Sequence, residues 1–113
     1  MEVLLVNERQ VLPQIRRRLV SAFMDLVILS RLKERPMSGY DIISLVYRKF
    51  RVLPGSGSVY SLLYSMERKG LIKGTWDERR RIYVLTPKGE ETIKAALDSY
   101  EGIENFMTAL LSG

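Results

Sequence analysis

The chain has 113 residues, of which 46% are hydrophobic, and this size fits one compact domain. It contains no cysteine and no histidine, which excludes disulfides, Cys/His metal sites and His-dependent catalytic triads. No apolar run approaches the roughly 18 residues that span a bilayer, and the first residues lack the pattern of a signal peptide. The composition therefore predicts a cytoplasmic protein without a membrane segment, cofactor or metal, and it argues against an enzyme.

Charge is distributed unevenly along the chain, whose net charge is +5. Residues 1–89 hold 17 Lys/Arg and 8 Asp/Glu, a net of +9, whereas residues 90–113 hold one and five, a net of −4. A basic body beside an acidic C-terminal segment indicates one surface that faces a polyanion and a second surface with another role. A solvated basic surface without a ligand is the alternative on charge alone.

The N-terminal third has two helical patterns. Apolar residues before Pro13 suit a short helix that stops there, although a strand-like arm fits them too. Between residues 14 and 35, apolar positions recur every three or four residues, which predicts one amphipathic helix. The basic run Arg16–Arg18 suits either a flank of the polyanion surface or a solvated helix face.

Two shorter helices are predicted next. Ser38 and Asp41 have the spacing of a capping box, and the helix that they open is broken by residues 53–55. A third helix begins at residues 56–58, and Gly70 ends it where a left-handed backbone costs glycine nothing. One face of this third helix has the spacing that packs on a core, with Val59, Leu62, Leu63 and Met66.

A hairpin and a final helix follow. Residues 71–76 and 81–85 are rich in β-branched and aromatic residues, which predicts an antiparallel hairpin around the polar residues 77–80. The one tryptophan, Trp76, is expected to pack the hairpin against the body, with the wall of a ligand pocket as the alternative. Thr86 caps the last helix and is followed by a proline at the first helical position.

Three helices followed by a hairpin are the element order of a winged helix-turn-helix. We therefore expect an α+β, mainly α fold in three parts. These are an N-terminal arm or helix (residues 1–18), a winged-helix domain with a three-helix core and a two-stranded β-wing (residues 19–89), and a long C-terminal dimerisation helix (residues 90–113).

The outward face of the third helix has residue types that suit a DNA major groove. Its hydroxyls and its arginine can reach phosphates or base edges, and small residues at its start let free amides approach phosphate. Arginines at the hairpin tip suit a phosphate backbone or a minor groove, with a charged edge that resists aggregation as the alternative. The predicted DNA-binding residues are Ser58, Tyr60, Ser61, Tyr64, Arg68, Arg79, Arg80 and Arg81.

The last helix carries a sustained apolar stripe that needs a cover. The stripe folds back on its own core or pairs with a second subunit, and a length of about 24 residues, roughly 36 Å, favours pairing. A two-fold dimer would place two third helices about 34 Å apart, as a pseudo-palindrome requires. The predicted interface residues are Ile93, Leu97, Tyr100, Ile103, Met107 and Leu110.

Four motifs resemble, in the same order, those of PadR-like transcriptional regulators. They are PMSGYDI at 36–42, PGSGSVYSLL at 54–63, MERKGLI at 66–72 and RRIYVLTPKG at 80–89. The resemblance implies DNA-binding repressors that dimerise through the C-terminal helix. It also implies DNA contacts from Ser58, Tyr60 and Ser61 and from Arg80 in the wing. Ser58 and Ser61 stand where the family usually has threonine and proline.

These observations predict a sequence-specific DNA-binding transcriptional regulator, acting as a repressor and as a homodimer on a pseudo-palindromic operator. A winged-helix module for protein–protein assembly, without sequence-specific DNA binding, is the alternative, but it would favour apolar or acidic residues on the third helix and the wing. An enzyme is not expected, because the sequence has no Gly-rich phosphate loop and no carboxylate cluster of defined spacing. A small-molecule effector is compatible with such a regulator, yet no set of residues indicates its site.

Overall fold

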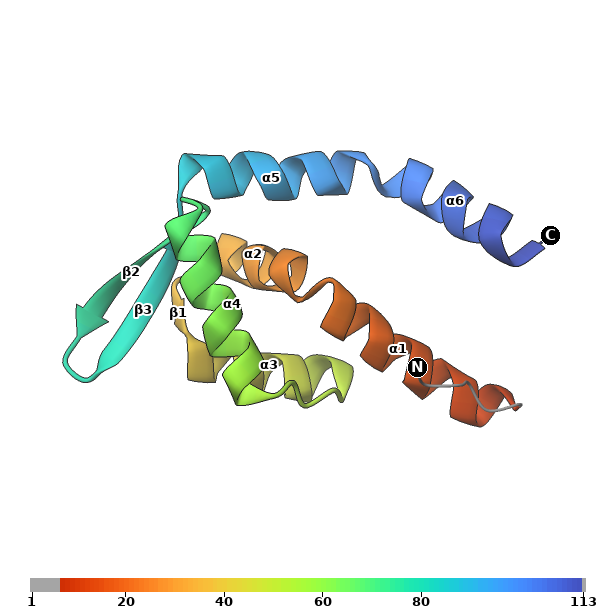
Figure 1. Cartoon of the computed structure of the whole chain (residues 1–113), viewed down its shortest axis with the longest axis horizontal. Helices are drawn as coiled ribbons and strands as arrows, with labels where there is room; N and C mark the ends of the chain where they lie inside the picture. Colours follow the sequence, from red (N-terminus) through yellow and green to blue (C-terminus); the bar gives the residue numbers. More distant parts are fainter. Residues whose placement is uncertain (1–6, 113) are drawn as a thin grey trace.

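The computed structural model describes residues 7–112, so the start of the predicted N-terminal arm lies outside the described residues (Figure 1). The elements are α1 (Glu8–Ala22), α2 (Met24–Glu34), β1 (Met37–Ser38), α3 (Gly39–Phe50), α4 (Ser56–Arg68), β2 (Ile72–Asp77), β3 (Arg80–Leu85), α5 (Pro87–Asp98) and α6 (Tyr100–Ser112). This order confirms the predicted, mainly helical winged-helix fold. Within residues 7–112, no helix combines the length and the apolar character needed to cross a membrane.

Local signals in the sequence set several helix ends. The Ser38 hydroxyl accepts a hydrogen bond from the Asp41 amide at 3.1 Å, and the Asp41 carboxylate accepts one from the Ser38 amide at 3.1 Å, which confirms the capping box. Thr86 caps α5 by accepting from the Gly89 amide at 3.1 Å. Gly70 has a φ of +78° directly after α4, as predicted for a helix C-terminus.

The core lies where α2, α3 and α4 meet the sheet, and α5 closes it from the far side (Figure 1). Its largest fully buried side chains are Ile28, Leu29, Met37, Ile42, Val46, Val59, Leu63 and Ile72. On α4, the predicted core residues Val59, Leu63 and Met66 are buried and Leu62 is half-buried, so this helix turns its other face outward.

The sheet has three antiparallel strands in the order β1-β3-β2, one more than predicted. The extra strand β1 has only two residues, too short for a periodic signal, and places Met37 opposite Tyr83. Strands β2 and β3 form the wing, which projects beyond the body (Figure 1). Their last pair leaves a two-residue turn of Glu78 and Arg79, in which Glu78 has a φ of +57°.

The structure corrects two expectations for the N-terminal third. Helix α1 does not stop before Pro13 but contains it. The helix begins at Glu8, where the Asn7 side chain caps it by accepting from the Gln10 amide at 3.1 Å. The proline removes a hydrogen bond to the carbonyl of Arg9, which is exposed, so water can satisfy that group. The single helix predicted for residues 14–35 is wrong as well. Phe23, with φ −113° and ψ 28°, divides it into α1 and α2.

The C-terminal helix is divided in a similar way. At Ser99, with φ −90° and ψ 2°, α5 ends and α6 begins. The Ser99 hydroxyl donates to the Ala95 carbonyl at 2.8 Å, a local bond of the kind that bends helices. The apolar spacing continues across the break, which is why the sequence pattern does not reveal it.

Helices α1 and α6 form two arms that leave the body on the same side (Figure 1). The Cα radius of gyration is 15.6 Å and the longest dimension is 50 Å. A compact chain of this length would have a radius of gyration of roughly 13 Å. The arms therefore extend beyond what the chain's own core can cover.

Candidate nucleic-acid interface

The outward face of α4 presents polar and aromatic side chains to solvent. Ser58, Ser61 and Arg68 are exposed, as are Tyr60 and Tyr64. The Arg68 guanidinium lies over the Tyr64 ring, 5.2 Å from its centroid, so the two side chains form one unit at the C-terminal end of this face. The structure thus brings together on one surface all five residues that the sequence predicted from this helix.

The N-terminus of α4 is open to solvent. Gly55 caps it without a side chain, and residues 56–58 are exposed. The first intrahelical donor is the Val59 amide, which bonds the Gly55 carbonyl at 3.1 Å. The three preceding amides point out of the helix start, where the helix dipole favours an anion such as phosphate.

The wing is held against α4 by an ion pair that the sequence did not predict. The Arg81 guanidinium is 2.6 Å from the Glu67 carboxylate, which also accepts from the Gly74 amide at 3.2 Å. Arg81 further lies over the ring of Trp76 at 5.4 Å and near that of Tyr83 at 6.0 Å. Both partners of the ion pair are less than one third exposed. Arg81, predicted to contact DNA, is therefore bound within the chain and fixes the wing.

This arrangement also sets the charge of Glu67. Partial burial raises the pKa of its carboxyl, but the hydrogen bonds from Arg81 and from the Gly74 amide, with the Arg81 charge, lower the pKa below its ordinary value overall. Glu67 stays ionised at neutral pH, and its negative charge is matched by Arg81.

A second ion pair joins the wing to α3. The Arg80 guanidinium is 3.8 Å from the Asp41 carboxylate, and the Arg80 side chain remains 58% exposed. The Ser38 amide lowers the pKa of Asp41 most, with smaller contributions from the Ser38 hydroxyl and Arg80. Arg79 is exposed in the wing turn, beside the exposed acidic residues Asp77 and Glu78. Arg79 and Arg80 are therefore the more exposed of the three wing arginines.

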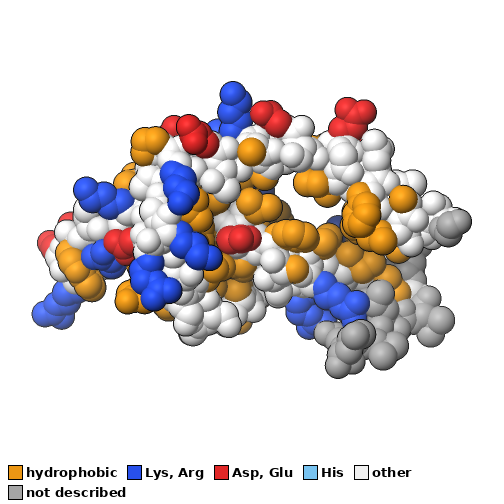
Figure 2. Space-filling view, turned by 45° about the horizontal axis from the view of Figure 1, so that its top comes forward, with side chains coloured by type: hydrophobic (Ala, Val, Ile, Leu, Met, Phe, Trp, Pro, Cys, Tyr) orange, Lys and Arg blue, Asp and Glu red, His pale blue; other side chains and the backbone are white. Residues whose placement is uncertain are grey.

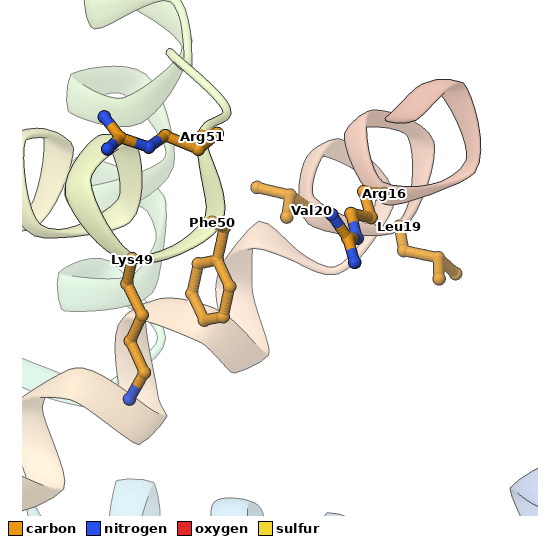
Figure 3. Close-up of a pocket in the computed structure, with 6 residues that line it drawn as sticks. All are labelled: Arg16, Leu19, Val20, Lys49, Phe50 and Arg51. Carbon is orange, nitrogen blue, oxygen red and sulfur yellow. The ribbon is translucent and has the colours of Figure 1, made fainter. Parts of the chain in front are cut away.

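The basic run of α1 is not part of this surface, because α1 and the wing lie at opposite ends of the molecule (Figure 1). Arg16 instead borders a pocket between α1 and the end of α3. Figure 3 shows Val20 pointing from α1 toward the end of α3, where Phe50 lies, while Arg51 extends away from the pocket. For Arg16–Arg18, a solvated helix face therefore fits this placement better than a flank of the DNA-binding surface.

Two exposed aromatic residues beside α4 were missed. Trp76 was expected to pack the wing on the body, yet it is 69% exposed, so this expectation is wrong. Trp76 lies four residues after the buried Ile72 on β2, so both side chains are on the same face of the strand. Near the tip of the wing, however, this face extends past the core, and Trp76 is exposed to solvent. Tyr40, at the start of α3, is 70% exposed.

The predicted dimer residues divide into two groups. Ile93 is 4% exposed and belongs to the core of its own chain, so it has no surface left for a partner, which corrects its prediction. The others are exposed: Leu97, Tyr100, Ile103, Met107 and Leu110. Figure 2 shows hydrophobic side chains gathered on the inner sides of the two arms, and Lys and Arg side chains gathered over the wing and the neighbouring part of the body.

Comparison with solved structures finds the same fold in several transcriptional regulators. A transcriptional regulator from Clostridium thermocellum superposes with a TM-score of 0.75 at 24% identity, covering 83% of this chain and 98% of that one. A PadR family transcription regulator from Clostridium difficile gives 0.71 at 27% identity, with coverages of 79% and 98%. A PadR-like transcriptional regulator from Bacillus cereus gives 0.72 at 24%, with 85% and 98%.

Comparison of sequences gives a consistent result. No curated protein matches the chain significantly. The family model of the transcriptional regulator PadR-like family, however, matches residues 28–95, more than half of the chain, from the middle of α2 to α5. The matched part contains α4 and the wing, with all the predicted DNA-binding residues. The chain therefore belongs to the transcriptional regulator PadR-like family and is a DNA-binding regulator.

Proposed function

We propose that the chain acts as a homodimer that binds a pseudo-palindromic operator sequence-specifically and represses transcription. One observation carries this proposal. The outward face of α4 is exposed, polar and free of unpaired carboxylates, because Glu67, its one acidic residue, is paired with Arg81. A surface of this kind can enter the major groove without repelling the phosphates on either side.

The contacts follow from the placement of the side chains. Ser58, Ser61 and Tyr64 reach base edges or phosphates in the groove, and the open amides of the α4 N-terminus bind a phosphate. Arg79 and Arg80 in the wing bind the neighbouring backbone, and Arg68 binds phosphate at the other end of α4. Arg81 contributes indirectly, because it holds the wing on Glu67.

Helix α6 supports the homodimer. None of its 13 residues is buried. Its large hydrophobic side chains Ile103, Phe106 and Leu110 are each at least half exposed. An apolar groove between α2 and the C-terminal helices continues this face and includes Phe23, Leu97 and Ile103. An apolar face of this extent on a regulator needs a cover in water, and the same helix of a second copy provides a self-complementary one. A dimer bound to an operator that overlaps a promoter represses transcription by blocking access to the promoter. Such a regulator acts in the cytoplasm, where the DNA lies.

Selection of binding sites from random duplexes tests the proposal, with affinity then measured across salt concentrations and mass measured by sedimentation. We expect an enriched inverted repeat, a dimer, and an affinity that falls with salt by a slope of about 0.9 for each phosphate contacted. Repression is tested by transcription in vitro from a promoter that overlaps the selected site. A dimer that enriches no sequence and shows no salt dependence would contradict the proposal and favour the alternative of a protein–protein assembly module.

A further inference from the structure

Three exposed aromatic side chains surround a depression between α4 and the wing. Tyr40 comes from α3, Tyr60 from α4 and Trp76 from β2, and they are 70%, 48% and 69% exposed. The depression has a volume of about 330 Å³. We call it the aromatic groove. Its remaining lining residues are Ser38, Gly39, Arg79, Arg80, Arg81 and Tyr83.

Two rings of the aromatic groove, those of Trp76 and Tyr60, are held in place although they are exposed. Trp76 lies against the Arg81 guanidinium, which is itself fixed by Glu67. Tyr60 packs so closely on α3 that a Cβ at Gly39 would overlap its ring. An exposed aromatic ring in a fixed position presents apolar surface to water and loses little conformational entropy when a ligand covers it.

We propose that the aromatic groove binds the sugar–phosphate backbone of one strand of duplex DNA, with the rings of Tyr40, Tyr60 and Trp76 packed on deoxyribose. This inference rests on the proposed function. The groove adjoins the outward face of α4 through Tyr60, so a strand beside the major groove that receives α4 passes through it. Arg79 and Arg80 on its rim supply the positive charge that the phosphates on either side of the sugars require.

The geometry favours a duplex backbone over unpaired bases. In a duplex the bases are stacked inside, and sugars and phosphates are what a protein surface meets first. A site for single strands stacks successive bases on aromatic rings along a basic channel. Here the rings come from three different elements and surround one depression, so they do not form a row along a channel. The depression also adjoins the exposed outward face of α4, which is the face proposed to enter the major groove. Unpaired DNA is therefore the competing ligand in the test.

Trp76 is the only tryptophan of the chain, so its fluorescence reports on the aromatic groove alone. We expect the selected duplex to change its emission on binding, and a single strand of the same length to change it far less at equal concentration. A single strand that binds as tightly and produces an equal change would overturn the assignment to the duplex backbone.

The variants Trp76→Ala and Trp76→Phe separate packing from charge. Because Trp76 is exposed, its replacement leaves the fold intact, which circular dichroism checks. We expect Trp76→Ala to weaken binding about tenfold on all sequences alike, and Trp76→Phe, which keeps a ring, to weaken it less. The matched control is Thr75→Ala, an exposed neighbour on the opposite face of the same strand, which should bind as the parent does.

Salt dependence completes the test. A ring that packs on sugar releases no counterions, so Trp76→Ala should keep the salt slope of the parent, whereas Arg79→Ala should reduce it by about 0.9. If the parent binds the duplex with a steep salt slope, but Trp76 fluorescence is unchanged and Trp76→Ala binds normally, the groove assignment is wrong and the proposed function stands. If the parent binds no duplex at all, the proposed function itself fails.

Discussion

The wing and helix α6 both project from the body, but they are held in different ways. The wing is held by the part-buried ion pair of Glu67 with Arg81 and by continuous pairing of its strands, and the more exposed pair of Asp41 with Arg80 adds less. Helix α6 has no buried residue and faces solvent with large hydrophobic side chains. The geometry of the wing is therefore encoded within one chain, whereas the position of α6 depends on what covers it.

The largest effect is expected when the apolar face of α6 is made polar, because this removes the surface that needs a cover. We expect Ile103→Asp combined with Leu110→Asp to give a monomer with a folded body, and to weaken operator binding about a hundredfold because two half-sites are no longer linked. Sedimentation velocity and duplex affinity measure the two effects. The matched control is Thr108→Asp, which by helical spacing lies on the other side of α6 and should stay dimeric. A double variant that remains dimeric would show that α6 is not the interface.

Replacing a glycine by alanine should have opposite effects on stability in the body and in α6. A Cβ at Gly89 would overlap the backbone carbonyl of Leu71, whereas one at Gly102 would meet nothing within 4 Å. We expect Gly89→Ala to lower the free energy of unfolding by about 2–3 kcal/mol, because backbone must shift. Gly102→Ala should raise it by up to about 1 kcal/mol, because alanine favours the helix. Urea denaturation measures both, and equal effects would contradict the contrast between body and arm.

Acid should weaken the attachment of the wing to α4. The folded-state pKa of Glu67 lies below its ordinary value of 4.5, so its stabilising contribution is complete above that pH and is lost as the pH falls through the lowered pKa. Asp41, lowered from 3.8, acts in the same direction. We expect the free energy of unfolding to fall between about pH 5 and pH 3, and to fall less in Glu67→Gln. An equal loss of stability in parent and variant would show that Glu67 does not hold the wing.

The smallest expected effect is at the wing turn. Glu78 has a φ of +57°, a conformation that asparagine tolerates better than glutamate. We expect Glu78→Asn to raise the free energy of unfolding by about 0.5 kcal/mol and to strengthen duplex binding slightly, because an acidic group beside Arg79 is removed. Asp77→Asn is the control that removes charge without relieving the turn, so it should strengthen binding without adding stability. Thermal unfolding and duplex titration separate the two, and an unchanged unfolding midpoint in Glu78→Asn would contradict the turn argument.

Much of the fold could be predicted because its signals are local. The capping box at Ser38, the cap at Thr86 and the glycine after α4 each depend on a few neighbouring residues, and the structure confirms them. The breaks at Phe23 and Ser99 could not be predicted, because the apolar spacing runs through both without interruption. Strand β1 was missed because two residues carry no periodicity.

The candidate site depended more on tertiary packing. Helical spacing was enough to place Ser58, Ser61 and Tyr64 on one outward face of α4, and their contacts with DNA stay a prediction. The pairing of Arg81 with Glu67 joins residues 14 positions apart on different elements, which no local pattern reveals. Ile93 shows the converse error, since its place in the apolar stripe fitted a dimer while the body needed it for its own core.

The absence of any buried residue in α6 also bears on how long a chain persists in the cell. A subunit without a partner exposes Phe106, Leu110 and Leu111, the last of them 82% accessible. Chaperones and proteases recognise exposed hydrophobic segments of this kind, and association removes them from reach. For the proposed homodimer, we therefore expect unassembled subunits to be cleared faster than assembled ones.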